Sequence, residues 1–189
     1  MDLIFVGAFF ESRYTIRVNK KIATLISRIF DPFVSLVAVF VLLFWNSKMM
    51  IPAFFLMVLL PLGLFFFAWK TKIISNWDVT DRRERPKILW MLFGIIFLST
   101  ILLRATVVIP ILVALFGFAV ISHFWKISGH TMAAALATGE IVHRLGWHWW
   151  PVLLIVPLLG WARVLRKDHT LAQVVMGAAF AWGLLLIMK

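Results

Sequence analysis

Residues 51–69 read IPAFFLMVLLPLGLFFFAW and contain no charged side chain. A helix that crosses the hydrocarbon core of a bilayer needs about 20 mostly apolar residues, so this stretch predicts a membrane span. The rest of the chain has the same character, because 63% of its 189 residues are hydrophobic and 14% are charged. Soluble domains contain roughly 45–50% apolar and about 25% charged residues. A soluble chain of this length could not bury so much apolar surface, and we therefore expect an integral membrane protein.

Similar apolar stretches recur along the chain and predict an all-α, polytopic bundle of six to seven transmembrane helices. The further spans are expected at residues 22–45, 88–103, 105–125, 149–164 and 170–188, with a weaker candidate at 130–145. The weak candidate is rich in Ala and Gly, which let helices approach closely in a membrane, so we expect it inside the bundle. Its Glu140 and Arg144 are spaced i,i+4 for an ion pair.

The sequence predicts that the chain has two regions of unequal size. Residues 1–28 begin with an apolar stretch too short to span, followed by basic residues, and are expected to lie at the membrane interface. Residues 22–189 form the transmembrane domain. The absence of cysteine excludes disulfides, thiolate metal sites and a cysteine nucleophile. The net charge is +11, and the Lys and Arg residues that carry it lie in short segments between the apolar stretches. This placement indicates membrane lipids or a phosphate-bearing ligand as the partner, and not nucleic acid.

Charged and polar residues gather in three segments, at residues 78–86, 126–130 and 163–169. Two predicted spans separate the first segment from the second, and two separate the second from the third. A chain that crosses the membrane and returns comes back to the same face. The three segments are therefore expected to meet on one side of the membrane, and ionisable groups collected in this way indicate a functional site.

The residue types in these segments suit a phosphate group. Arginine offers a planar fork of donors to phosphate oxygens. Ser128 and Gly129 directly precede a predicted helix, whose free backbone N–H groups favour an anion. His130 and His169 can exchange protons near neutral pH, and a neutral histidine can also attack phosphorus. No carboxylate-rich metal cage is apparent, so we expect a metal-independent reaction without a cofactor.

These residues form a pattern that resembles the type 2 phosphatidic acid phosphatase superfamily, also called the lipid phosphate phosphatases. The motifs of that family read K-x6-R-P, P-S-G-H and S-R-x5-H-x3-D. Residues 128–130 match the second motif, Arg163 and His169 have the spacing of the third, and Arg85 with the following Pro matches the end of the first. The resemblance covers roughly residues 72–180.

The resemblance implies a role for each matched residue. His169 would be the nucleophile that forms a phosphohistidine, and His130 would be the general acid that protonates the leaving oxygen. Arg163 and Arg85 would hold the phosphoryl oxygens, helped by Ser128 and the Gly129 backbone, because charge builds on these oxygens in the transition state. Arg82 and Lys126 each have two possible roles, either binding the substrate phosphate or anchoring the protein to lipid headgroups.

Four positions depart from the family pattern. Asp78 replaces the Lys of the first motif, and Lys72, Arg82 and Arg83 are candidates to supply the missing cation. Ile127 and Ala162 replace a Pro and a Ser, and Gln173 replaces the orienting Asp. We expect Asp78 and Asp81 to pair with the neighbouring arginines, Arg82 and Arg83.

Gln173 stands at i+4 from His169, so its carbonyl can accept a hydrogen bond from the ring but adds no full negative charge. The segment HTLAQV resembles the H-T-x-x-Q-V version found in dolichyl-diphosphatase-like members, which favours a polyprenyl diphosphate as substrate. A phosphatidylglycerophosphate or phosphatidate phosphatase is the alternative within the class.

Two readings outside this class remain open. A degenerate family member would bind or move a lipid without hydrolysing it. Residues 76–81 faintly resemble the N-D-x-x-D motif of membrane prenyltransferases, but the second Asp-rich motif that such enzymes need is missing. The expected location is the plasma or inner membrane. Most Lys and Arg fall on the side of the three polar segments, which favours the cytoplasm, although site arginines inflate that excess. The oligomeric state is left open.

Overall fold

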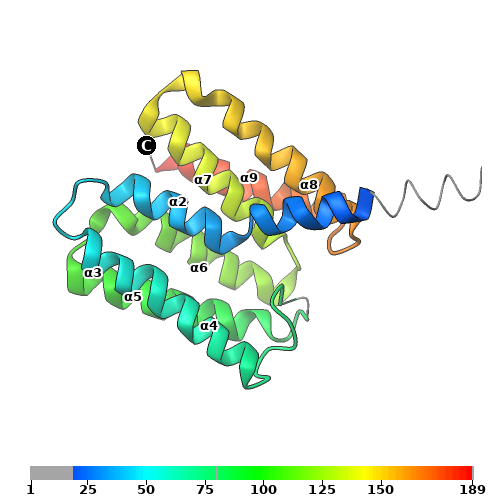
Figure 1. The fold of residues 1–189 in the computed structure, drawn as a ribbon, viewed down its shortest axis with the longest axis horizontal. Coiled ribbons are helices and arrows are strands. Elements are labelled where there is room, and N and C mark those ends of the chain that lie inside the picture. Colours follow the sequence, from blue (N-terminus) through cyan, green and yellow to red (C-terminus); the bar gives the residue numbers. More distant parts are fainter. Residues whose placement is uncertain (1–18, 80, 189) are drawn as a thin grey trace, which may run out of the picture.

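The protein is an all-α bundle in a computed structural model that describes residues 19–79 and 81–188 (Figure 1). Residues 19–29 are helical and lead into α2 after a break at residues 30–31. The labelled helices are α2 (Pro32–Phe44), α3 (Met50–Phe54), α4 (Leu60–Lys70), α5 (Arg85–Leu103), α6 (Ile109–Phe124), α7 (Gly129–Leu145), α8 (Ile155–Leu165) and α9 (Leu171–Ile187). A π-helical turn (Phe55–Leu59) joins α3 to α4, and 3₁₀ turns precede α6 (Thr106–Val108) and α8 (Trp147–Leu154).

Five helical stretches in the described part are long and apolar enough to cross a membrane, by length and composition. They are Asn19–Phe44, Met50–Lys70, Arg85–Leu103, Thr106–Phe124 and Trp147–Leu165. Helix α9 is apolar but shorter, and α7 carries polar residues at both ends. The prediction of a multi-pass helical bundle is thus confirmed, with span ends within a few residues of those expected. Residues 1–18 of the expected interfacial segment lie outside the described residues.

Helix α7 lies inside the bundle, as its small residues predicted. It packs against α2, α8 and α9, and Ala134, Ala135 and Ala137 are at most 5% exposed. The predicted ion pair is also present, with Arg144 Nε 2.8 Å from Glu140 Oε2. In Figure 1, α7, α8 and α9 form one group, α4, α5 and α6 form another, and α2 lies between them.

The start of α7 is tied directly to the first turns of α9. The Ser128 N–H donates to the Gln173 carbonyl at 3.0 Å, and Thr131 Oγ1 donates to the Val174 carbonyl at 3.2 Å. Gly177 permits this approach, because a Cβ at that position would lie 2.6 Å from the Ser128 carbonyl oxygen and 2.8 Å from Thr131 Oγ1. The absence of a side chain at one position of α9 thus keeps the two helix starts, and the histidines beside them, together.

Candidate functional site

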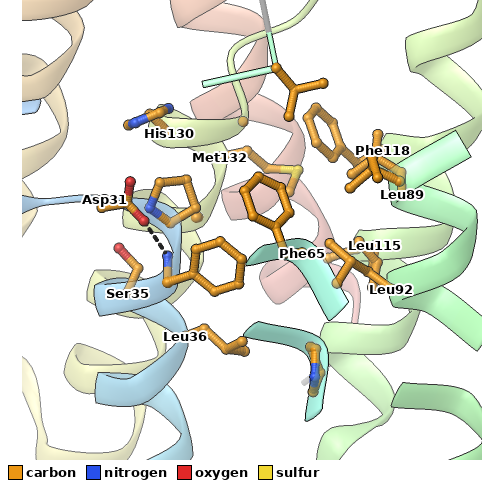
Figure 2. A pocket seen from close by; sticks show the side chains of 18 of the residues that line it. Asp31, Ser35, Leu36, Phe65, Leu89, Leu92, Leu115, Phe118, His130 and Met132 are labelled. Atoms are coloured by element: carbon orange, nitrogen blue, oxygen red, sulfur yellow. Dashed lines mark hydrogen bonds between the residues drawn. The ribbon is translucent and has the colours of Figure 1, made fainter. Parts of the chain in front are cut away.

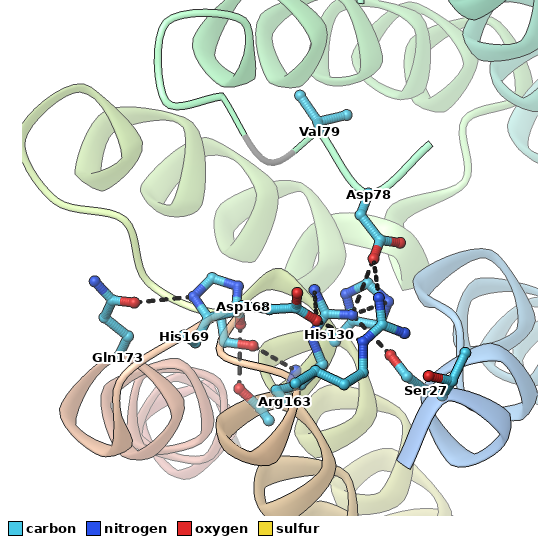
Figure 3. A network of polar contacts seen from close by, with 12 residues as sticks. Ser27, Asp78, Val79, His130, Arg163, Asp168, His169 and Gln173 are labelled. Atoms are coloured by element: carbon cyan, nitrogen blue, oxygen red, sulfur yellow. Dashed lines mark hydrogen bonds and ion pairs between the residues drawn. The ribbon is translucent and has the colours of Figure 1, made fainter. Parts of the chain in front are cut away.

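The three polar segments meet at one end of the bundle (Figure 3). Arg85 Nη1 donates to the Ile127 carbonyl at 2.9 Å, which joins the first segment to the second. Arg163 Nη1 lies 3.5 Å from His130 Nε2, and Arg166 Nη2 lies 3.0 Å from Asp78 Oδ2. The prediction that these three segments meet is therefore confirmed.

Helix starts surround this end of the bundle. Helices α5, α7 and α9 begin at the first, second and third polar segments, so their N-terminal N–H groups and positive dipole ends face the same region. Ser128 caps α7 by accepting from the Thr131 N–H, and Thr170 caps α9 by accepting from the Gln173 N–H. A site built on three helix N-termini favours an anionic ligand.

Arg163 lies at the centre of the cluster and is only 1% exposed. Its Nη1 donates to Ser27 Oγ at 2.7 Å and to Asp78 Oδ2 at 3.2 Å, and its Nη2 lies 3.2 Å from Asp168 Oδ2. Its Nε has no hydrogen-bond partner among the described residues. A buried donor without a partner is costly, so this Nε–H is available for an acceptor on a ligand.

Asp78 binds different arginines from those expected. The prediction that it pairs with Arg82 or Arg83 is wrong, because its Oδ2 lies between Arg163 Nη1 and Arg166 Nη2. Arg166 also reaches Asp168 Oδ2 through Nε at 2.8 Å, which closes a network of two arginines and two carboxylates. Burial opposes ionisation of Asp78, but the charges of Arg163, His130 and Arg166 outweigh it and lower the pKa of this carboxyl. The position at which the resembled family has Lys thus carries an anion that binds the central arginine.

His169 has a defined tautomer. Gln173 Oε1 accepts from the Thr170 N–H at 3.1 Å, and because that group can only donate, the amide oxygen must face it. The same Oε1 lies 3.1 Å from His169 Nδ1, which must therefore carry the ring proton and donate it. The lone pair of a neutral His169 is then on Nε2, the atom left to act as nucleophile or base.

The charge state of His169 agrees with this arrangement. Burial and the positive charges of Arg85 and Arg163 lower the pKa of His169 to about 4, against a smaller opposing effect of the Gln173 hydrogen bond. Burial, followed by the charge of Arg85, also lowers the pKa of Lys126. His169 is consequently neutral at physiological pH.

We expect the pH profile of kcat/KM to report this pKa. Activity that requires neutral His169 should fall as the pH drops through about 4. Gln173→Glu adds a negative charge that favours the protonated ring, so the acid limb should move to higher pH while the α9 cap is kept. Gln173→Leu removes the side-chain half of the capping box and the tautomer control, and should lower kcat/KM about 10–100-fold, a typical cost of losing an orienting partner. An acid limb that does not move in Gln173→Glu would contradict the assignment.

The second segment is held rigidly around His130. Gly129 lies against the Phe118 ring, where a Cβ would approach Phe118 Cζ to 2.9 Å.

The first segment is held by Arg85. Arg85 is buried, and its Nε donates to the Val79 carbonyl at 3.0 Å. Val79 adopts a left-handed conformation with φ 43°, which is strained for a β-branched residue. The backbone next to Asp78 is thus kept in an unfavourable geometry by its surroundings.

One of the predicted phosphate contacts is directed elsewhere. Arg82 Nη2 donates to the carbonyls of His123 and Phe124, at 2.7 and 2.5 Å, and so binds the C-terminal end of α6. The sequence interpretation in turn missed Arg166, which looked like part of an ordinary interfacial charge run, although its i+3 spacing from Arg163 places both on one helix face. It also missed Ser27, for which the sequence carries no signal.

Three residues near the site could also hold a cation. The ligand atoms of Asp31, Asp78 and His130 lie within 4.8 Å of one another, a grouping that the sequence did not reveal. The Arg163 guanidinium lies 3.2 Å from Asp78 Oδ2 and 3.5 Å from His130 Nε2, so a positive charge already borders this space. That charge opposes a divalent ion, and the metal-independent reaction stays a prediction.

Known proteins give a limited comparison. A stretch of 57 residues, 30% of the chain, is 39% identical to the lipid A 4′-phosphatase of Helicobacter pylori. The match spans 29% of the length of that protein. No protein-family model and no solved structure matches the chain. The fold thus defines a multi-pass membrane protein, and part of its sequence is distantly similar to a lipid A 4′-phosphatase.

Proposed function

We propose that the protein is a membrane lipid phosphatase that works through a phosphohistidine. The observation that carries this proposal is the hydrogen bond between His169 Nδ1 and Gln173 Oε1, which leaves the ring lone pair on Nε2, in the same polar cluster as Arg163 and His130 (Figure 3). The partial similarity to a lipid A phosphatase and the motif resemblance support the same class.

The proposed reaction has two steps. His169 Nε2 attacks phosphorus, so a P–N bond forms while the bond from phosphorus to the leaving lipid oxygen breaks, and His130 donates a proton to that oxygen. Water then attacks the phosphohistidine, His130 accepts the water proton, and inorganic phosphate and free His169 are produced. Arg163, Arg85 and Lys126, with Ser128 and the Gly129 backbone, stabilise the charge on the phosphoryl oxygens.

Two observations bear on the substrate. The HTLAQV segment, like dolichyl-diphosphatase-like members, favours a polyprenyl diphosphate, from which one phosphate would be removed. The similarity to the Helicobacter pylori protein favours a phosphorylated glycolipid of the lipid A kind as the second candidate. The active-site face is proposed to be cytoplasmic, on the charge distribution alone.

The direct test is phosphate release by the purified protein in detergent. Its substrates are a polyprenyl diphosphate, a lipid A bisphosphate and a phosphatidate, each with and without EDTA. We expect release from at least one of them, unchanged by EDTA. Loss of release in EDTA would overturn the metal-independent mechanism and point to the Asp31, Asp78 and His130 group. Lipid binding without any release would contradict hydrolysis and support the non-enzymatic alternative.

A further inference from the structure

An apolar cavity of about 220 Å³ runs into the bundle from the site (Figure 2). Helices α2, α4, α5, α6 and α7 enclose it with side chains that are almost all hydrophobic. Its polar lining is concentrated at one end, where Asp31, Asp78, Arg85 and His130 lie. A cavity of 150 Å³ is enough to bind benzene inside a protein, so this one has room for part of a hydrocarbon chain.

The position of this cavity fits the leaving side of the proposed reaction. In an in-line displacement the nucleophile and the leaving oxygen lie on opposite sides of phosphorus. Of the two histidines, His130 lines the cavity and His169 does not. His130 is the group proposed to protonate the leaving oxygen, and that oxygen carries the lipid. The lipid tail would therefore begin at the cavity mouth.

At its inner end the cavity adjoins a second, smaller cavity, and the two share three apolar lining residues. Leu36 on α2, Ile96 on α5 and Ile111 on α6 line this cavity and also a second one of about 20 Å³. The second cavity continues along the bundle toward Phe44, the last residue of α2, and Val108, which directly precedes α6. Since a helix rises 1.5 Å per residue, Arg85 and Ile96 on α5 are separated by about 16 Å.

We infer that the cavity holds a single hydrocarbon tail of the substrate and that Leu36, Ile96 and Ile111 form a floor that sets the tail length. This inference rests on the proposed function and favours single-chain lipids, such as polyprenyl phosphates and diphosphates, as its substrates. A lipid with several acyl chains could place only one of them in the cavity.

The inference can be tested with a series of n-alkyl phosphates, from octyl to eicosyl, at a fixed mole fraction in detergent micelles. For the wild type, kcat/KM should rise with each methylene that enters the cavity and should stop rising at the length that reaches the floor. Ile111→Ala opens the floor toward the second cavity and should move this break to longer chains. Leu36→Ala, on the opposite wall, should move it in the same direction.

Ile109→Ala is the matched control, because Ile109 lies on α6 outside the cavity and is 42% exposed. It should leave the break unchanged. A second readout needs no catalysis: alkyl phosphates should raise the melting temperature of the His169→Ala protein up to the same chain length. A profile without a break, or a break that stays in place in both floor variants, would overturn the inference even if phosphate is released. Binding with the expected break but without release by the wild type would contradict the proposed function instead.

Discussion

Replacing His169 with Ala should lower kcat/KM for phosphate release by about 10⁴-fold or more, since removal of a nucleophile takes away the covalent route. The buried ring contributes Nε2 to the reaction, while its Nδ1 is held by Gln173 Oε1 at 3.1 Å. Alanine leaves the Thr170–Gln173 cap of α9 in place, so the protein should still fold. Phosphate release and the melting temperature in detergent, measured on the same samples, check both expectations.

The control for this prediction is His123→Ala. His123 lies at the same end of the bundle, is exposed, and accepts a hydrogen bond from Trp90 Nε1 at 3.0 Å. Its loss should change kcat/KM only slightly. An equal drop in the two variants, or near-normal activity of His169→Ala, would rule out His169 as the nucleophile.

The covalent intermediate can also be sought directly. An aryl phosphate has a leaving group that needs little protonation, so His130→Ala should still transfer its phosphoryl group to His169 and then hydrolyse it slowly. The labelled protein should lose phosphate in acid and keep it in alkali, as a P–N bond does.

The membrane bundle could be predicted from the sequence because hydropathy acts on whole stretches. A span needs only enough consecutive apolar residues, and residues 51–69, which contain no charged side chain, meet that condition directly. The meeting of the three polar segments followed from counting crossings. The buried position of α7 followed from its alanines, since small side chains favour helix contact in a bundle.

The side-chain partners within the site could not be predicted in the same way. Asp78 was expected to bind its neighbours in sequence, but the rotation of α8 brings Arg163 and Arg166 to it. Ser27 reaches Arg163 across 136 positions of sequence, and such a contact depends on helix rotation and tilt, which hydropathy does not specify. The apolar cavity has the same origin, because it arises from how five helices diverge and not from any local motif.

Arg163→Lys is expected to lower kcat/KM by about 10²–10³-fold while the positive charge is retained, similar to the loss of one stabilising donor in other sites. The guanidinium makes contacts in several directions at once, to Ser27, Asp78 and Asp168, while its Nε–H has no partner among the described residues. A lysine ammonium is a single point that cannot reproduce this fork. The loss should appear mainly in kcat, because charge on the phosphoryl oxygens increases in the transition state.

Arg166→Lys is the matched control for Arg163→Lys. It makes the same substitution three residues further on, at the C-terminal end of α8. Arg166 binds the same two carboxylates as Arg163, but its side chain is 21% exposed, where water can replace part of each contact. We expect its kcat/KM to stay within about 10-fold of the wild type. Similar losses in the two variants would show that the network acts only as a support, because a direct phosphate contact by Arg163 requires the larger effect there.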